Sequence, residues 1–193
     1  MSDYLVMAYV EGTDLHSLCK HYGALPSEHV VSYIVQAAAG LSHAHSRHVF
    51  HRNVKPSNLL LDRQGVVKVI GLGLARIDID IDDGSALTKP GQMMGTYDYM
   101  APEQAVDSRT ADHRADIYSL GCTMFKLLTG RAVYPEKSVL RKVRAHSEAP
   151  VPSMRQVKSE IPLFLDLLCQ KMLAKRPEDR FQSMDEVIAT LKR

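Results

Sequence analysis

The sequence is poor in cysteine, in net charge and in long apolar runs, and each shortage excludes a class of protein. Three scattered cysteines, Cys19, Cys122 and Cys169, lie in apolar helical patterns, which predicts buried free thiols and a reducing compartment. A net charge of +2 gives no support for a nucleic-acid or membrane-surface partner. No apolar run approaches the roughly 18 residues of a membrane span, and no signal-peptide pattern begins the chain. We therefore expect a soluble cytoplasmic protein of one domain.

What is present is a hydrophobic pattern typical of a helical protein with a few short strands. A β-prone run covers residues 4–10, and two further strands, 59–61 and 66–69, flank a turn that ends in Gly65. Apolar residues at three- and four-residue spacing predict helices over 14–22, 27–46, 112–128 and 138–146, from Pro162 through Met172, and from Ser183 to the chain end. The predicted fold class is α+β, mainly α.

Two of these helices carry expectations about their faces. In the helix over 27–46, Ser27 is the expected N-cap, and the buried stripe is Val31, Ile34, Val35, Ala38 and Leu41. The helix over 138–146 has a basic face, for which a solvated surface is favoured over a binding patch; its side chains are Lys137, Arg141, Lys142 and Arg144.

Two clusters of possible metal ligands have spacings that match no standard site. Four histidines, at positions 43, 45, 48 and 51, have no nearby cysteine or acid, so helix-end and core histidines are favoured over zinc ligands. Four aspartates between residues 78 and 83 lack the Gly and Glu positions of an EF-hand loop, so a solvated loop is favoured over calcium binding.

The stretch from His51 to Gly73 carries the clearest functional motif. It begins His-Arg-Asn-Val-Lys-Pro-Ser-Asn and ends Val-Ile-Gly-Leu-Gly. This stretch resembles the catalytic and metal-binding loops of protein kinases, whose signatures are H-R-D-x-K-x-x-N and D-F-G. Asn53 stands where that family has its catalytic Asp, and Gly71 stands where it has the magnesium-binding Asp.

Four further segments resemble the same family, in the family's order. They are residues 5–12 (the adenine-binding hinge), 95–103 (the substrate-docking loop that ends in Ala-Pro-Glu), 116–121 (the central helix) and 175–180 (a late segment whose Arg pairs with the Glu of Ala-Pro-Glu). Lys55 and Thr96 place the resemblance in the Ser/Thr branch, and the motifs look closest to the bacterial kinases.

The resemblance implies a kinase C-terminal lobe without the N-terminal β lobe. It covers residues 1–193, with a hinge strand at 4–10, a catalytic-loop region at 51–73, an activation segment at 71–103 and a helical subdomain at 112–193. One departure lies at His48, where the family usually has Gly. Histidine tolerates the left-handed backbone conformation expected there better than most residues, at some cost.

The resemblance also implies a role for individual residues. Sorted by role, they are catalytic Asn53, Lys55 and Asn58; metal-binding Asn58 alone; adenine-contacting Ala8, Val10 and Leu60; substrate-loop Thr96; and structural His51, Arg52, Glu103, Asp116 and Arg180. Glu103 and Arg180 are expected to form a buried ion pair.

The two replaced acids predict weak or absent catalysis. The amide of Asn53 cannot act as a base near neutral pH, and Gly71 offers magnesium no ligand. ATP and Mg²⁺, the cofactors that the resemblance implies, are therefore expected to bind weakly or not at all.

We expect a pseudokinase-like protein-binding or regulatory module. Its protein partner, or a second copy of the chain, is expected on an apolar face around Leu5, Met7, Leu60 and Leu72, where the N-terminal lobe of a kinase would sit. Two alternatives stay open. One is a lobe of an active ATP-dependent Ser/Thr protein kinase whose N-terminal lobe is missing from this chain, and the other is a degenerate product without a selected function.

Overall fold

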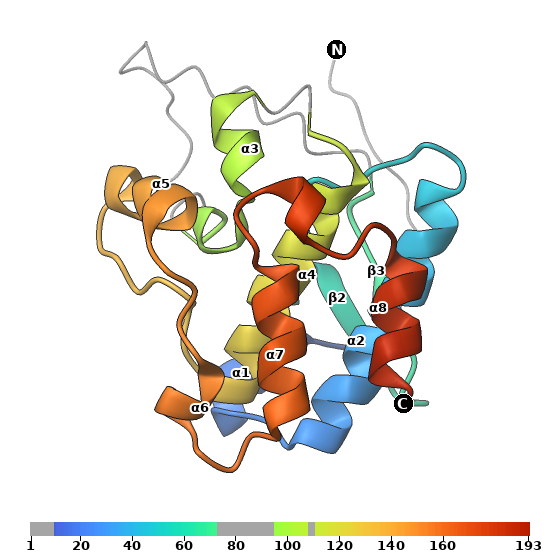
Figure 1. The fold of residues 1–193 in the computed structure, drawn as a ribbon. Helices are drawn as coiled ribbons and strands as arrows, with labels where there is room; N and C mark the ends of the chain where they lie inside the picture. Colours follow the sequence, from blue (N-terminus) through green and yellow to red (C-terminus); the bar gives the residue numbers. More distant parts are fainter. Residues whose placement is uncertain (1–9, 73–94, 108–110) are drawn as a thin grey trace, which may run out of the picture.

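A buried helix lies at the centre of the fold. The structure is a computed structural model, and it describes residues 10–72, 95–107 and 111–193. In it, α4 (His113–Thr129) packs against α2 (Ser27–His45) and α7 (Leu163–Met172) (Figure 1). Residues 115–125 and 127–129 of α4 are all buried, as expected for a helix that is surrounded on every side. Gly130, at φ +74°, ends α4 in the left-handed conformation.

Shorter elements surround these three helices. They are α1 (Leu15–Tyr22), α3 (Pro102–Val106), α5 (Val139–Glu148), α6 (Met154–Val157), α8 (Met184–Leu191) and the single-turn helices η1 (Pro56–Asn58), η2 (Tyr97–Tyr99) and η3 (Pro177–Asp179). Every helix predicted from the sequence is present to within two residues at each end, whereas α3 and α6 were too short for periodicity to reveal. Within the described ranges, no helix combines the length and apolar character that crossing a bilayer requires.

A small antiparallel sheet lies at one end of the molecule. Its order is β1 (Gly12–Asp14), β2 (Leu59–Asp62), β3 (Val67–Val69), and the hairpin between β2 and β3 is the predicted one. The predicted strand over 4–10 falls outside the described residues except for Val10, which is not in a strand. With one three-stranded sheet among the residues that the structure describes, the fold is mainly α, as predicted.

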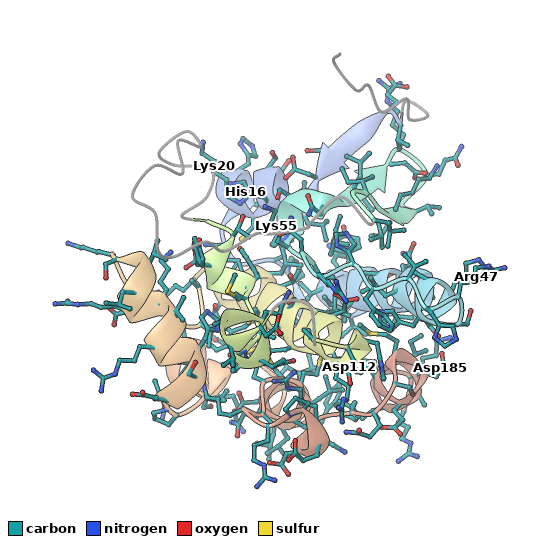
Figure 2. The ribbon with its side chains drawn as sticks, turned by 90° about the horizontal axis from the view of Figure 1, so that it is seen from above. His16, Lys20, Arg47, Lys55, Asp112 and Asp185 are labelled. Atoms are coloured by element: carbon teal, nitrogen blue, oxygen red, sulfur yellow. The ribbon has the colours of Figure 1, made fainter. Side chains whose placement is uncertain are left out.

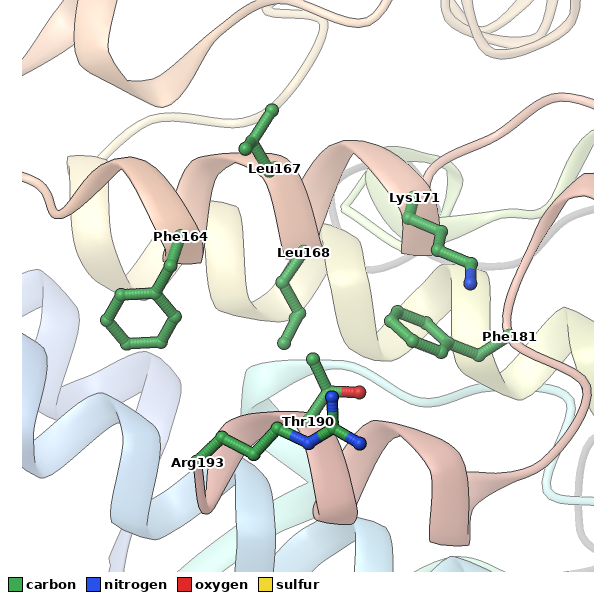
Figure 3. A pocket seen from close by; sticks show the side chains of 7 residues that line it. All are labelled: Phe164, Leu167, Leu168, Lys171, Phe181, Thr190 and Arg193. Carbon is green, nitrogen blue, oxygen red and sulfur yellow. The ribbon is translucent and has the colours of Figure 1, made fainter.

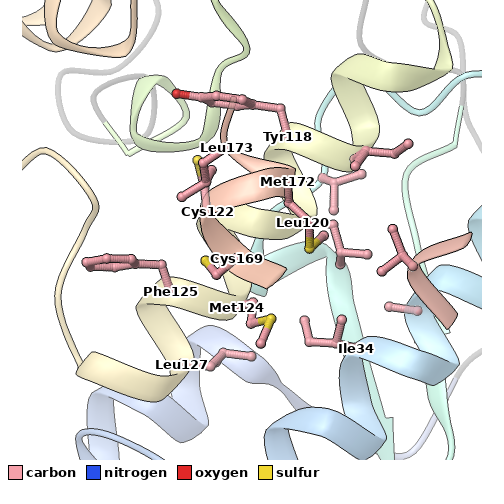
Figure 4. Packing of buried hydrophobic residues seen from close by; sticks show 14 of the residues in the cluster. Ile34, Tyr118, Leu120, Cys122, Met124, Phe125, Leu127, Cys169, Met172 and Leu173 are labelled. Carbon is pink, nitrogen blue, oxygen red and sulfur yellow. The ribbon is translucent and has the colours of Figure 1, made fainter. Parts of the chain in front are cut away.

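The hydrophobic core fills the space between α2, α4 and α7 (Figure 4). Ile34 of α2, Met124 of α4 and Met172 of α7 have no solvent exposure. All three cysteines are buried and free, as predicted, and burial raises the pKa of the Cys122 thiol well above its ordinary value. These thiols therefore serve as small apolar side chains of the core.

Three expectations about the helices need correction, two of them only in part. The buried face of α2 includes Val30 and Ala37 in place of Val31 and Val35, which are only partly buried. The α2 N-cap is Pro26, which has no side-chain hydrogen bond, and Ser27 is the first helical residue. On the basic face of α5, Lys137, Arg141 and Arg144 are exposed as expected, whereas Lys142 is 7% exposed and forms an ion pair with Asp98.

Candidate functional site

The buried carboxylate of Asp116 holds the start of the catalytic-loop segment. Asp116 lies in the first turn of α4 and has no solvent exposure. Its Oδ2 accepts the backbone N–H of His51 at 2.8 Å, and its Oδ1 accepts the backbone N–H of Arg52 at 2.7 Å. His45 Nε2 also lies 2.8 Å from Oδ2. Three donors on one carboxylate fix this turn, in which Arg52 adopts a left-handed φ of +60°.

His51 ties the same segment to the end of the sheet. Its Nδ1 accepts the backbone N–H of Asn53 at 3.3 Å, which leaves the proton on Nε2. Nε2 then donates to the carbonyl of Ile70 at 2.9 Å, next to Gly71. The His51 ring therefore links Asn53 to Ile70, the residue before Gly71.

The structure brings the positions 53, 58 and 71 together. Asn58 Nδ2 donates to the backbone carbonyl of Asn53 at 2.8 Å. A Cβ built on Gly71 would point toward Asn58, with 3.9 Å to Nδ2. The backbone of Gly71 is left-handed, with φ +82°. The backbone therefore places positions 58 and 71 so that their side chains could meet, but position 71 is a glycine and has no side chain.

These residues do not fit a magnesium ion. Mg²⁺ favours anionic oxygens in octahedral geometry, and positions 53, 58 and 71 supply no carboxylate, only neutral amides. No group of three or more His, Cys, Asp or Glu residues in the described part of the chain could hold a metal ion elsewhere.

Lys55 connects the catalytic-loop segment to the predicted substrate loop. Its Nζ donates to Thr96 Oγ1 at 2.9 Å, across 41 positions of sequence. Burial lowers the pKa of Lys55, because the charged ammonium loses part of its hydration. The structure therefore brings together Lys55 and Thr96, which the sequence pointed to separately.

Gln104 is a positioning residue that the sequence reasoning missed. Its Nε2 donates to the carbonyl of Arg52 at 2.9 Å, and its Oε1 accepts the backbone N–H of Ala101 at 3.1 Å. Gln104 is the third residue of α3, where a Glu or Gln commonly turns back to the helix start. A Gln at the third position of a helix that begins at Pro102 was the sequence signal that could have identified this residue.

The expected Glu103–Arg180 ion pair forms. The two guanidinium nitrogens Nη1 and Nη2 lie 2.6 and 2.8 Å from the two carboxylate oxygens. The Arg180 side chain is fully buried, whereas that of Glu103 is 21% exposed. The pair joins α3 to the segment that follows α7.

The predicted adenine contacts are placed only in part. Ala8, like Leu5 and Met7, lies outside the described residues. Val10 and Leu60 are half-buried, and Leu60 pairs with Asp14 and Lys68 in the sheet. Leu72, which follows Gly71, is 41% exposed.

An apolar groove lies between α7 and α8 (Figure 3). Its volume is about 630 Å³, and Leu168 and Phe181 line it. On α7, the side chains of Phe164 and Leu167 are 53% and 55% exposed. Lys171 and Arg193 are the charged residues that line it, so the groove is apolar with a basic edge.

A buried polar cluster supports α5. Tyr118 and Tyr134 flank the ring of His146, and the Tyr118 hydroxyl is hydrogen-bonded to His146 Nδ1 at 2.8 Å. Burial, with the nearby charges of Lys175 and Lys142, lowers the pKa of His146 to about 3. His146 is therefore neutral in the folded protein at ordinary pH.

Comparison with known proteins matches the chain to one family. The protein kinase domain matches residues 2–190. The chain is 36% identical over 184 residues to serine/threonine-protein kinase PknH of Mycobacterium bovis, covering 95% of this chain and 30% of that protein. It is 37% identical over 185 residues to serine/threonine-protein kinase PknD of Mycobacterium tuberculosis, covering 95% and 27%. For serine/threonine-protein kinase PknB of Mycolicibacterium smegmatis the identity is 35% over 189 residues, covering 97% and 30%. The chain thus spans no more than 30% of the length of these relatives.

Proposed function

The chain belongs to the protein kinase family, and we propose that it is a catalytically impaired member that acts by binding a protein partner. One observation carries the proposal. The scaffold that positions the catalytic-loop segment is present, through Asp116 and the Glu103–Arg180 pair, while Asn53 and Gly71 replace the two acids that the chemistry needs.

Each replacement removes a separate part of phosphoryl transfer. Asn53 can hydrogen-bond a hydroxyl but cannot take up its proton, and the loss of a general base lowers a rate by roughly 10²- to 10⁴-fold. Gly71 leaves Asn58 as the one metal-directed side chain at this point of the described structure. Kinases in general use ATP with Mg²⁺ to neutralise the charge that develops on the phosphoryl group. Both losses together support a role other than catalysis.

A phosphotransfer assay tests the proposal. The purified chain is incubated with radiolabelled ATP and a general protein substrate, with Mg²⁺ and with EDTA. We expect no incorporation above the EDTA background. Magnesium-dependent incorporation that the variant Lys55→Ala abolishes would overturn the proposal.

The competing function is that of an active Ser/Thr kinase that needs residues outside this chain. The names and the identity of 35–37% of the relatives favour it. It predicts incorporation once a longer form of the protein is assayed, and loss of that incorporation in Lys55→Ala. The impaired-kinase proposal predicts none in either form.

We place the partner, or a second copy of the chain, on the face that includes Leu60 and Leu72. Support comes from the 41% exposure of the Leu72 side chain, because exposed apolar side chains are common at interfaces. Sedimentation velocity over a range of concentrations tests self-association. The variant Leu72→Asp is expected to weaken it, whereas Leu167→Asp, which alters the groove between α7 and α8, is the matched control. A monodisperse monomer at high concentration would exclude self-association through this face.

A further inference from the structure

A cavity of about 680 Å³ lies beside the catalytic-loop segment. Its walls come from α1, from residues 55–58, from residues 95–99 and from the end of α4. Figure 2 shows His16 and Lys55, two of its lining residues, on the side of the molecule away from Arg47. A cavity of this size is large enough for a modified amino-acid side chain and part of its neighbours.

The side chains that line this cavity carry a positive balance. Lys55 and Lys126 are cations, and His16 adds a third basic side chain. The one acid among the lining residues, Asp98, forms an ion pair with Lys142, whose side chain is only 8% exposed. Asp98 is thus neutralised by a neighbour, whereas the two lining lysines leave an attractive field for an anion.

The replacements at positions 53 and 71, which lie next to this cavity through Asn58, remove two negative charges from its surroundings. The kinase signatures place an Asp at each position, and two carboxylates without a metal ion would repel a phosphate group. Here, position 53 carries a neutral amide and position 71 has no side chain. Asn58, which lines the cavity, donates to the backbone carbonyl of Asn53, and a side chain on Gly71 would point toward it. The changes that remove catalysis therefore also remove the repulsion of a bound anion.

Hydrogen-bond donors remain for such an anion. The Lys55 ammonium has three N–H groups, of which one donates to Thr96 Oγ1. A phosphorylated side chain carries a charge of roughly −1.5 to −2 and three acceptor oxygens at neutral pH. Charge-assisted bonds from Lys55 are the kind that phosphate groups favour.

We propose that this cavity binds the phosphate group of a phosphorylated serine or threonine within a peptide, without a metal ion. The inference deepens the proposed function and rests on it, since it names the partner as a phosphorylated protein segment. A peptide is favoured over free phosphate because the cavity also presents Pro56 and Tyr99 to the residues that would flank the phosphate.

Fluorescence anisotropy tests the proposal. The probe is a labelled peptide with one phosphothreonine among alanine and glycine residues, titrated at low ionic strength in EDTA, and its unphosphorylated twin is the reference. We expect the phosphopeptide to bind at least about tenfold more tightly than the twin, as one charge-assisted contact of about 1.4 kcal/mol requires. Inorganic phosphate is expected to compete only at far higher concentration than the phosphopeptide.

Three variants locate the site. Asn53→Asp keeps the side-chain shape and adds one negative charge, so it is expected to weaken phosphopeptide binding about tenfold. Lys55→Ala is expected to weaken it by a similar factor. Arg47→Ala removes a cation from the far side of the molecule and should leave the affinity unchanged (Figure 2). Thermal unfolding of each variant verifies that it is folded.

The outcomes separate this inference from the proposed function. Equal binding of the two peptides, equal competition by inorganic phosphate, or no effect of Asn53→Asp would each overturn the inference. Because the titration contains EDTA, none of these results bears on phosphotransfer. Magnesium-dependent phosphotransfer, measured separately, would overturn the proposed function and leave the binding result standing.

Discussion

Arg180 and Glu103, 77 positions apart in the sequence, form a two-point ion pair in which Nη1–Oε1 is 2.6 Å and Nη2–Oε2 is 2.8 Å. The other three N–H groups of the guanidinium donate to the backbone carbonyls of Arg114, Ala174 and Lys175. All five donors of Arg180 are therefore used, and one buried side chain joins α3, α4 and the segment after α7.

Removing Arg180 is expected to destabilise the fold strongly. Arg180→Met leaves Glu103 and three carbonyls without their donor, which should lower the free energy of unfolding by about 3–5 kcal/mol. Glu103→Gln should cost less, because the guanidinium keeps its three carbonyls and Glu103 is partly exposed. Urea unfolding measures both.

The matched control for Arg180→Met is Arg176→Met. Arg176 pairs with Glu178, but the two side chains are 74% and 53% exposed. An exposed pair contributes only about 0–1 kcal/mol. A loss at Arg176 as large as that at Arg180 would show that burial does not set the strength of the pair.

Replacing His48 by glycine is expected to stabilise the fold. The structure gives His48 a left-handed φ of +57°, as the sequence predicted, and its side chain is exposed. His48→Gly should therefore raise the free energy of unfolding by about 1 kcal/mol, since the left-handed strain is relieved and no packing is lost. Arg47→Gly, at the exposed neighbour without a left-handed φ, should lower it by about 0.5–1 kcal/mol. A urea midpoint for His48→Gly below that of the wild type would contradict the prediction.

Stability should fall in acid because of His146. Its folded pKa is about 3, whereas an unfolded histidine titrates near 6.5, so the unfolded chain binds the extra proton between these values. The stabilisation is complete above about pH 6.5 and is lost at roughly 1.4 kcal/mol per pH unit as the pH falls toward 3. Urea unfolding from pH 7 to 4.5 measures the slope.

The control for this pH dependence is His146→Gln, which cannot titrate in this range. The variant is expected to be less stable at pH 7, because the ring is buried between Tyr118 and Tyr134, but its stability should depend less on pH. Equal slopes for the variant and the wild type would exclude His146 as the cause.

Gly71→Asp is expected to create a metal site. The new carboxylate would leave the backbone in the direction of Asn58, and Asp tolerates a left-handed φ better than most residues. Titration with Mn²⁺, followed by electron paramagnetic resonance, should show binding on the order of 10⁻³ M, as for a site with few ligands. The double variant Gly71→Asp, Asn58→Ala should lose it, and equal binding by the wild type would contradict the account.

The helices and the family could be read from the sequence because their signals are local. Periodicity predicted α2, α4 and α7, and the resemblance to bacterial-type Ser/Thr kinases is confirmed by the comparisons. The resemblance also named Asp116 and His51 as structural residues, and in the structure Asp116 accepts the backbone N–H of His51.

The contacts that sequence reasoning missed join residues that no single motif contains together. Lys142 looked solvated because its neighbours on α5 are charged, but Asp98, 44 positions earlier, removes it from water. The positive cavity beside Lys55 could not be predicted either, because its walls come from four segments that only the fold brings together. Single-helix patterns carry no information on such neighbours.

We propose that Asn53 and Gly71 leave this kinase fold unable to use ATP with magnesium. A thermal-shift titration of the chain with ATP, with and without Mg²⁺, is the direct test, since a ligand that binds the folded chain raises its melting temperature by an amount set by the ratio of ligand concentration to Kd. The account predicts that Mg²⁺ adds nothing to any shift that ATP produces. A rise in melting temperature that requires ATP and Mg²⁺ together, and that the variant Asn58→Ala abolishes, would contradict it.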